Sequence, residues 1–183
     1  MLDDHVCPWW LAYTFDHRLR RLLHNPEKIL SPYVREGMTA LDIGCGMGFF
    51  SISMAKLVGA SGSVIAVDLQ QKMLDNLEKR AKHAGVADRI ITHRCEPENI
   101  GNHRNIDFTL TFWMVHEVPN LQKFLTQIYN ALKSGGKYLL VEPKIHVSAD
   151  SFEKTVKIAG QVGFKMLETP PVAISRAVLF GKA

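Results

Sequence analysis

From Thr39 onward, the sequence alternates short runs of β-branched and apolar residues with longer amphipathic stretches. The clearest helical spacing places Leu121, Phe124, Leu125 and Ile128 on one face. The runs VIAV and YLLV are apolar throughout, as is typical of strands buried on both faces. Strands that alternate with helices form a parallel sheet covered on both sides, so the pattern predicts a three-layer, Rossmann-like α/β fold. The expected strands are residues 39–43, 63–68, 89–95, 107–113, 137–142, 164–168 and 175–183.

The end of the chain departs from this alternation. Pro170-Pro171 separates the last two runs, and no helical stretch lies between them, so these strands should pair antiparallel. We therefore expect a mostly parallel seven-stranded sheet with an antiparallel C-terminal hairpin. Helices are expected at 49–59 and 70–85, and from Leu121 to a stop at Gly135-Gly136. A further helix should begin at a capping box of Asp150 and Glu153 and run towards Gly163. A short helix should begin near the N-terminus, with Asn25 as N-cap and Pro26 at its first position.

Length and composition set the class of protein. The 183 residues, 46% of them hydrophobic and 22% charged, predict one domain, with a helical lid segment over 1–36 and an α/β core over 37–183. No apolar run reaches the about 18–20 residues of a membrane span, and no secretory signal is present, so we expect a cytoplasmic protein with no membrane partner. The sequence carries no signal for the oligomeric state.

Charge and cysteine spacing exclude further classes. The formal charge of +4 is spread along the chain without a basic run, so we do not expect a nucleic-acid partner. Three scattered cysteines and eight histidines show no paired ligand spacing, so neither a disulfide framework nor a metal site is expected.

Three alternate glycines follow the first predicted strand, in LDIGCGMGFFS at residues 41–51. Glycine allows positive φ and lets a ligand approach the backbone, and a turn of this kind before a helix suits a nucleotide-like cofactor. Asp68 ends the second strand 24 residues after Gly44, close to the about 20 expected for an acid that binds ribose hydroxyls. The GxGxG spacing differs from the dinucleotide fingerprint, and no P-loop is present.

With Asp42 two residues before the first glycine, the pattern D-x-G-x-G-x-G resembles motif I of the class I S-adenosylmethionine (SAM)-dependent methyltransferases. The segments FWMVHEV and ALKSGGKYLLVE also resemble family signatures, and the chain looks most similar to the small-molecule branch that includes the ubiquinone/menaquinone C-methyltransferases. A carboxylate beside the turn suits the cationic amino group of SAM and would repel a pyrophosphate. The resemblance implies methyl transfer from SAM to a small-molecule acceptor, with S-adenosylhomocysteine as the other product.

The resemblance also implies a role for each residue of the cofactor site. Asp42 would lie near the methionine end, and the turn of Gly44, Cys45, Gly46 and Gly48 would line the cofactor. Asp68 would bind the ribose hydroxyls, and Leu69 and Glu96 would contact adenine. Phe112 and Trp113 would border the methyl group. Pro97, which follows Glu96, has no N–H, so a backbone donor that many relatives offer to adenine is missing here.

Catalysis by methyl transfer needs mainly positioning, and a base only where the acceptor must lose a proton. His116, just past the fourth strand, is then the first candidate, and Glu117 lies at the same place. A purely structural role is the alternative for both. Trp9, Trp10 and Tyr13 should form an apolar lid over the acceptor, or else pack a helix onto the sheet.

Two other functions stay open beside methylation of a small molecule. The pI near 9.0 suggests an RNA or protein methyltransferase, but FWMV stands where a [DN]PP[YF] segment would be expected. The third alternative is a non-catalytic SAM-binding partner subunit, because nothing after the fifth strand builds a cap over a substrate.

Overall fold

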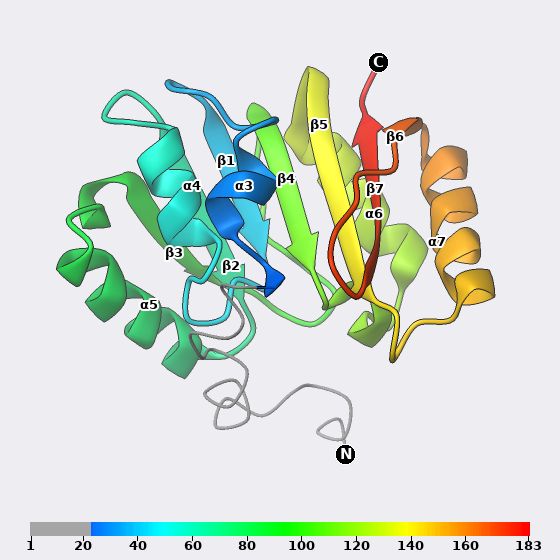
Figure 1. Cartoon of the computed structure of the whole chain (residues 1–183), viewed down its shortest axis with the longest axis horizontal. Coiled ribbons are helices and arrows are strands. Elements are labelled where there is room, and N and C mark those ends of the chain that lie inside the picture. The colour runs from blue at the N-terminus through cyan, green and yellow to red at the C-terminus, as the bar shows by residue number, and fades with distance from the viewer. Residues whose placement is uncertain (1–22) are drawn as a thin grey trace.

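The computed structural model describes residues 23–183, whose helices and strands alternate as expected (Figure 1). Asn25 caps the first described helix as predicted, since its side chain accepts the N–H of Lys28 at 3.1 Å and Pro26 begins the helix. The helices are α3 (Pro26–Leu30), α4 (Ser51–Leu57), α5 (Gln71–His83), α6 (Leu121–Ala131) and α7 (Ala149–Val162), with the 3-10 turns η1 (Ala87–Arg89) and η2 (Val115–Glu117). The strands are β1 (Thr39–Ile43), β2 (Ser63–Asp68), β3 (Ile90–Arg94), β4 (Ile106–Phe112), β5 (Leu132–Pro143), β6 (Lys165–Glu168) and β7 (Ser175–Gly181).

The described strands form one seven-stranded sheet in the order β3-β2-β1-β4-β5-β7-β6. Strands β1 to β5 pair in parallel. Strand β7 lies between β5 and β6 and runs antiparallel to both. The prediction of a mostly parallel sheet with an antiparallel C-terminal hairpin is therefore confirmed.

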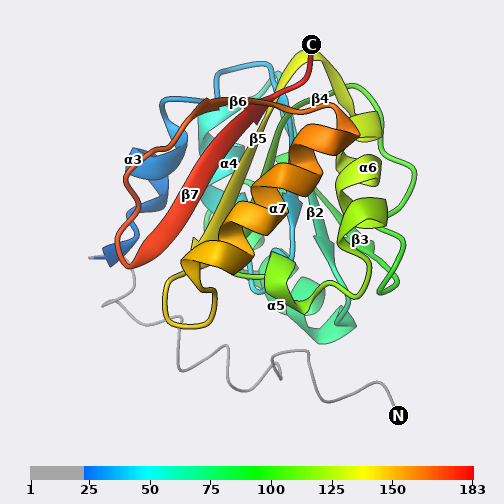
Figure 2. The ribbon, with the colours of Figure 1, turned by 90° about the vertical axis from the view of Figure 1, so that its right-hand side faces the viewer.

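Alternate residues of the central strands bury the two faces of the sheet under different helices. In β5, Leu139 and Val141 belong to the apolar layer under α3, α4 and α5. Tyr138 and Leu140 of the same strand belong to the layer under α6 and α7. Figure 2, turned by 90°, shows α3 and α4 on one side of the sheet and α6 and α7 on the other. Burial on both faces explains why these strands are apolar throughout rather than alternating.

Several element boundaries differ from the prediction. Helix α6 ends at Ala131 rather than at Gly135-Gly136, because Leu132 already pairs with Ile106 of β4. Strand β5 then continues through both glycines, where Gly135 N–H donates to the Lys182 carbonyl at 2.8 Å.

The start of α7 also differs from the expected capping box. Its N-cap is Ser148, whose side chain accepts the N–H of Ser151 at 3.1 Å. Asp150 lies in the first turn instead, where its charge still favours the helix N-terminus.

Candidate functional site

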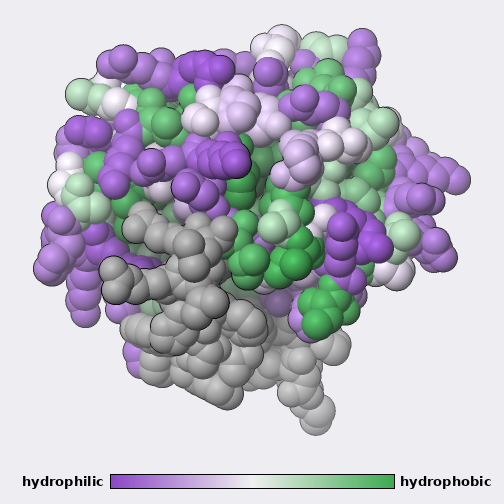
Figure 3. All heavy atoms as spheres, in the orientation of Figure 1, coloured by the Kyte–Doolittle hydropathy of each residue, from purple (hydrophilic) through white to green (hydrophobic). Residues whose placement is uncertain are grey.

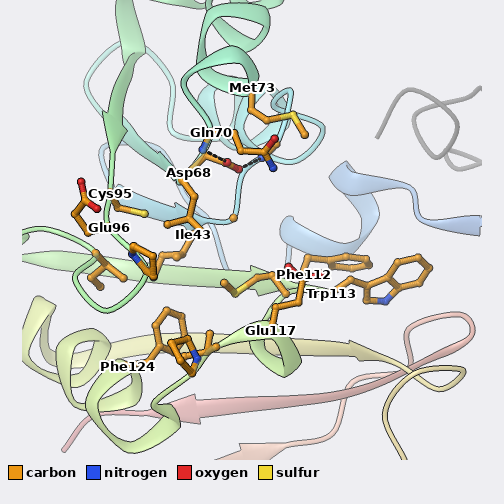
Figure 4. A pocket seen from close by; sticks show the side chains of 18 residues that line it. Ile43, Asp68, Gln70, Met73, Cys95, Glu96, Phe112, Trp113, Glu117 and Phe124 are labelled. Atoms are coloured by element: carbon orange, nitrogen blue, oxygen red, sulfur yellow. Dashed lines mark hydrogen bonds between the residues drawn. The ribbon is translucent and has the colours of Figure 1, made fainter. Parts of the chain in front are cut away.

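The carboxyl ends of β1 and β4 meet where the strand order of the sheet reverses, which is where open α/β sheets bind their ligands. A pocket opens there, lined by the turn after β1, the ends of β2 and β3, and the segment from the end of β4 to the first turn of α6. Figure 4 shows Asp68 and Gln70 on one side of this pocket and Glu117 and Phe124 on the opposite side.

The glycine turn after β1 gives the pocket a bare-backbone edge. Gly44, Gly46 and Gly48 have φ values of 71°, 53° and 83°, in the left-handed region that is costly for other residues. A Cβ added at Gly44 would lie 2.8 Å from Met114 Cγ, and one at Gly48 would lie 2.8 Å from Leu77 Cγ. A Cβ at Gly46 would meet no atom within 4 Å. Gly46 therefore leaves open space for a ligand, while the other two glycines allow close packing within the protein.

Asp68 ends β2 beside this turn, with 9% of its surface exposed. Its Oδ2 accepts the N–H of Gly46 at 2.9 Å, and its Oδ1 accepts the N–H of Gln70 at 2.9 Å. Burial raises the pKa of Asp68, and hydrogen bonds from the backbone partly offset that rise. Because each carboxylate oxygen has two lone pairs, Asp68 retains acceptor capacity that can bind two neighbouring hydroxyl groups.

Three residues assigned to the cofactor by resemblance lie beside the pocket rather than on its lining. Asp42 is 2% exposed and accepts a hydrogen bond from the Ser51 hydroxyl at 2.5 Å, which ties the end of β1 to the start of α4. Cys45 is buried with its Sγ 3.6 Å from the Gly46 carbonyl oxygen, and burial raises the pKa of this thiol. Together with Gly48, these residues shape the turn.

The ends of β2 and β3 supply a second wall, which includes Leu69, Cys95, Glu96 and Pro97. The backbones of Glu96 and Asn99 exchange hydrogen bonds of 3.1 and 3.0 Å, so Pro97 lies in a tight turn. Burial raises the pKa of Cys95 to about 11, which keeps its thiol neutral at pH 7. Apolar surface from Leu69 and Pro97 with one acceptor, Glu96, is a combination that suits a purine with an amino group.

Two aromatic residues at the end of β4, Phe112 and Trp113, line the pocket with ring centroids 5.5 Å apart. Trp113 has a φ of 62°, which is unusual for a bulky residue and is a form of strain found at functional sites. Its N–H donates to the Val141 carbonyl at 2.8 Å, and its indole N–H donates to Ser175 Oγ at 2.9 Å. His24 packs edge-on against both rings. Neighbouring strands thus hold the strained residue at the pocket.

The two candidate bases occupy different places. Glu117 lines the pocket, whereas His116 lies behind it, with Nδ1 2.7 Å from Glu142 Oε2 and Nε2 4.0 Å from Glu117 Oε1. A carboxylate only accepts hydrogen bonds, so Nδ1 of His116 carries the proton. The hydrogen bond to Glu142 raises the pKa of His116, burial opposes the rise, and the charges of Glu142 and Glu117 add to it.

The charges on the pocket lining are all negative. Asp68, Glu96 and Glu117 contribute carboxylates, and none of the described lining residues is a lysine, arginine or histidine. A lining of one sign attracts ligands of the opposite charge. The pocket therefore suits a cationic ligand and disfavours a phosphate.

The aromatic residues expected to form a lid, Trp9, Trp10 and Tyr13, lie outside the described residues, so their role stays a prediction. Within residues 23–183, no group of three or more His, Cys, Asp or Glu side chains is arranged to hold a metal ion. In the same part of the chain, no helix has the length and apolar character needed to cross a membrane.

Several lining residues were not predicted from the sequence. Gln70 and Met114 directly follow residues that were identified, and the rule that ligands bind at the carboxyl ends of strands could have found them. Val118 and Phe124 reach the pocket because α6 begins beside it, and their sequence pattern shows only a helix face.

Comparison with known proteins places this geometry in a family. The model of a methyltransferase domain matches residues 34–168. A demethylmenaquinone methyltransferase of Lactobacillus johnsonii is 33% identical over 110 residues, which cover 60% of this chain and 45% of that protein. A demethylmenaquinone methyltransferase of a Geobacillus species is 32% identical over 131 residues, which cover 67% of this chain and 53% of that protein. This chain therefore spans about half the length of the curated relatives it matches.

Solved structures agree with the fold. The crystal structure of a SAM-dependent methyltransferase from Aquifex aeolicus superposes with a TM-score of 0.87 at 24% identity, covering 97% of this chain and 100% of that one.

Proposed function

The chain belongs to the family of SAM-dependent methyltransferase domains, and from this premise we propose that it methylates a small, largely apolar acceptor in the pocket between β1 and β4. The observation that carries the proposal is the pairing of open backbone at Gly46 with the buried Asp68 carboxylate, 2.9 Å from its N–H. Both lie at the point where the strand order reverses.

The residues of the pocket fit the cofactor in three respects. Gly46 leaves space beside the turn, and Asp68 has acceptor capacity for the two ribose hydroxyls. Leu69 and Glu96 offer an apolar contact and an acceptor to adenine. The acidic lining complements the sulfonium and ammonium groups, whereas a nicotinamide dinucleotide would bring a pyrophosphate to the same carboxylates.

When bound, SAM supplies a methyl group on a positively charged sulfur. The chain's own contribution is to hold the reactants in line, an effect that can supply about 7–11 kcal/mol of a barrier. Asp68 would fix the ribose, and Phe112 and Trp113 would exclude water from the reacting end of the pocket.

Apolar side chains argue for an acceptor with little charge. Phe112, Trp113, Met114 and Phe124 line the pocket. The start of β7 lies beside the pocket, because Ser175 accepts the indole N–H of Trp113. The preceding residue, Ile174, is exposed, and its carbonyl accepts the N–H of Lys144 at 3.0 Å, which brings the exposed Ile145 to the same edge. Figure 3, in the orientation of Figure 1, shows hydrophobic residues on the surface of this side of the molecule.

The names of the matched relatives are consistent with such an acceptor, because demethylmenaquinone carries an apolar fused-ring head. We therefore propose a ring-bearing acceptor of the quinol class.

Methyl transfer from tritiated SAM tests the proposal. The chain is incubated with 1,4-dihydroxynaphthalene as a defined acceptor and, separately, with cell extract that is then fractionated into small molecules, RNA and protein. Label in 1,4-dihydroxynaphthalene or in the small-molecule fraction is the expected result. Label confined to RNA or protein would overturn the acceptor class, and binding of S-adenosylhomocysteine without any transfer would indicate a non-catalytic partner subunit.

A further inference from the structure

One buried carboxylate organises the segment that follows β4. Glu142, at the end of β5, is 3% exposed. Its Oε1 accepts the N–H groups of Met114 and Val115, each at 3.1 Å. Its Oε2 accepts the N–H of His116 at 3.1 Å and faces the Nδ1 of the same residue at 2.7 Å. Three consecutive backbone donors and one ring nitrogen of a pocket wall therefore converge on a single side chain from the neighbouring strand.

This arrangement fixes the orientation of the His116 ring. Nδ1–H points to Glu142, so Nε2 is directed to the other side, where Glu117 Oε1 lies 4.0 Å away. The side chain of Glu117 is 25% exposed and belongs to the pocket lining. A chain of charged groups thus runs from the buried end of β5 to the wall of the pocket.

We propose that Glu117 is the group that accepts a proton from the methyl acceptor, and that Glu142 is a positioning residue that acts on Glu117 through His116. The proposal rests on the proposed function, because it assigns the base of that reaction. A protonated imidazole between two carboxylates favours the ionised form of Glu117 and holds it at the wall.

The change in charge during methyl transfer explains why a proton acceptor, rather than a carboxylate that only balances charge, suits the position of Glu117. A carboxylate that only balanced the positive sulfur would lose that interaction as the methyl group leaves, so it would stabilise the ground state more than the transition state. A carboxylate that takes the proton acts in the transition state itself, because bond formation to the methyl carbon makes the proton of the acceptor more acidic.

In the proposed step, the O–H or C–H bond of the acceptor breaks and its proton passes to Glu117. The electron pair left on the acceptor forms the bond to the methyl carbon, while the carbon–sulfur bond breaks and its pair stays on sulfur.

Among the described residues, the titratable groups that face the His116 ring come from three places. Glu142 comes from β5, Glu117 from η2, and His146 from the segment after β5, with its ring stacked at a centroid distance of 6.0 Å. The two carboxylates favour the protonated ring, and a charged His146 would oppose it.

Long-range proton–nitrogen NMR of the His116 ring tests the positioning role without any acceptor. We expect the neutral ring to carry its proton on Nδ1. In Glu142→Gln the negative charge is lost and the side-chain NH2 group faces two N–H donors, so the midpoint of the His116 titration should fall. Glu142→Asp, which keeps the charge, should restore part of the difference. A proton on Nε2, or an unchanged midpoint in Glu142→Gln, would overturn the arrangement.

Kinetics with 1,4-dihydroxynaphthalene, or with the small-molecule acceptor isolated from extract, tests the base. Glu117→Gln should lower kcat about 100-fold or more while the affinity for S-adenosylhomocysteine stays within about twofold. His116→Asn should lower kcat less and shift the acidic limb of the pH profile. Glu153→Gln, an exposed change on α7, is the matched control and should match the wild type.

The outcomes separate the two proposals. An unchanged kcat in Glu117→Gln removes Glu117 as the base even though methyl transfer itself stands. A wild-type chain that fails to bind S-adenosylhomocysteine removes the proposed function, and with it the base, whereas the NMR comparison still decides whether Glu142 orients His116.

Discussion

Replacement of Gly46 by alanine should separate cofactor binding from fold stability. The φ of 53° makes an L residue unfavourable by about 1–2 kcal/mol, and the added Cβ meets no protein atom within 4 Å. Backbone conformation is therefore the whole cost to the fold. For a chain of this length, about 2–4 °C of melting temperature corresponds to each kcal/mol, so we expect a loss of about 2–8 °C.

The same methyl group should interfere strongly with the cofactor. The added Cβ projects into open space at the glycine turn, where the cofactor is proposed to lie against the Gly46 backbone. Overfilling a packed site costs about 1–3 kcal/mol. Since about 1.4 kcal/mol is tenfold in affinity, S-adenosylhomocysteine should bind about 5- to 150-fold more weakly by isothermal titration calorimetry.

Gly85→Ala is the matched control. Gly85 has a φ of 67°, and its added Cβ also meets no atom within 4 Å. It lies after α5 and before β3, at the opposite edge of the sheet from the pocket. We expect the same loss of melting temperature with unchanged affinity. Wild-type affinity in Gly46→Ala, or equal losses of affinity in both variants, would show that the cofactor does not lie against Gly46.

Four further predictions concern other contacts. Asp68→Ala should weaken binding of S-adenosylhomocysteine about 10- to 150-fold by calorimetry, through lost hydrogen bonds to a charged group. In the wild type, affinity should fall as the pH drops, and the fall should begin at a higher pH than for an ordinary carboxyl group because burial raises the pKa of Asp68. The same pH profile in the wild type and in Asp68→Ala would contradict this. Folding raises the pKa of His116, so the protonated ring should contribute fully to the unfolding free energy below about pH 6.5. This contribution should be lost as the pH rises through the folded-state pKa. In urea unfolding, the stability that His116→Asn loses relative to the wild type should therefore shrink at alkaline pH. Ser175→Ala removes the acceptor of the Trp113 indole and should lower the unfolding free energy by about 0.5–1.5 kcal/mol in the same assay, and no change would show that this bond adds nothing to stability.

The sequence predicted the fold well because its strands and helices have strong periodic signals. The Pro170-Pro171 break between the last two runs was enough to predict the antiparallel hairpin. The errors fall where pairing between distant residues decides a boundary. Leu132 leaves the helix because Ile106 offers it a place in the sheet, and local sequence around Gly135 contains no sign of that partner.

The candidate site was predictable in its motifs and less so in its three-dimensional contacts. Gly46 and Asp68 were identified from spacing alone, and the structure brings them to 2.9 Å. Asp42 was assigned a place near the cofactor, yet its carboxylate bonds to Ser51 away from the lining. The direction in which the Asp42 side chain points depends on how β1 sits in the sheet, and the motif does not specify that direction.

The relation between His116 and Glu117 could not be predicted because it depends on Glu142. Glu142 lies 26 residues beyond His116 in the sequence, inside an apolar strand where it reads as an isolated acid. Parallel pairing of β4 with β5 places it under the following turn. The side chain that points to the pocket is consequently Glu117, although histidine was the more obvious candidate from its chemistry.

A crystal structure of the chain with S-adenosylhomocysteine tests the assignment of the cofactor site. We expect both ribose hydroxyls within hydrogen-bonding distance of Asp68, the cofactor backbone against Gly46, and adenine between Leu69 and Pro97. A ligand bound elsewhere, or a ribose that makes no contact with Asp68, would contradict the assignment of this pocket.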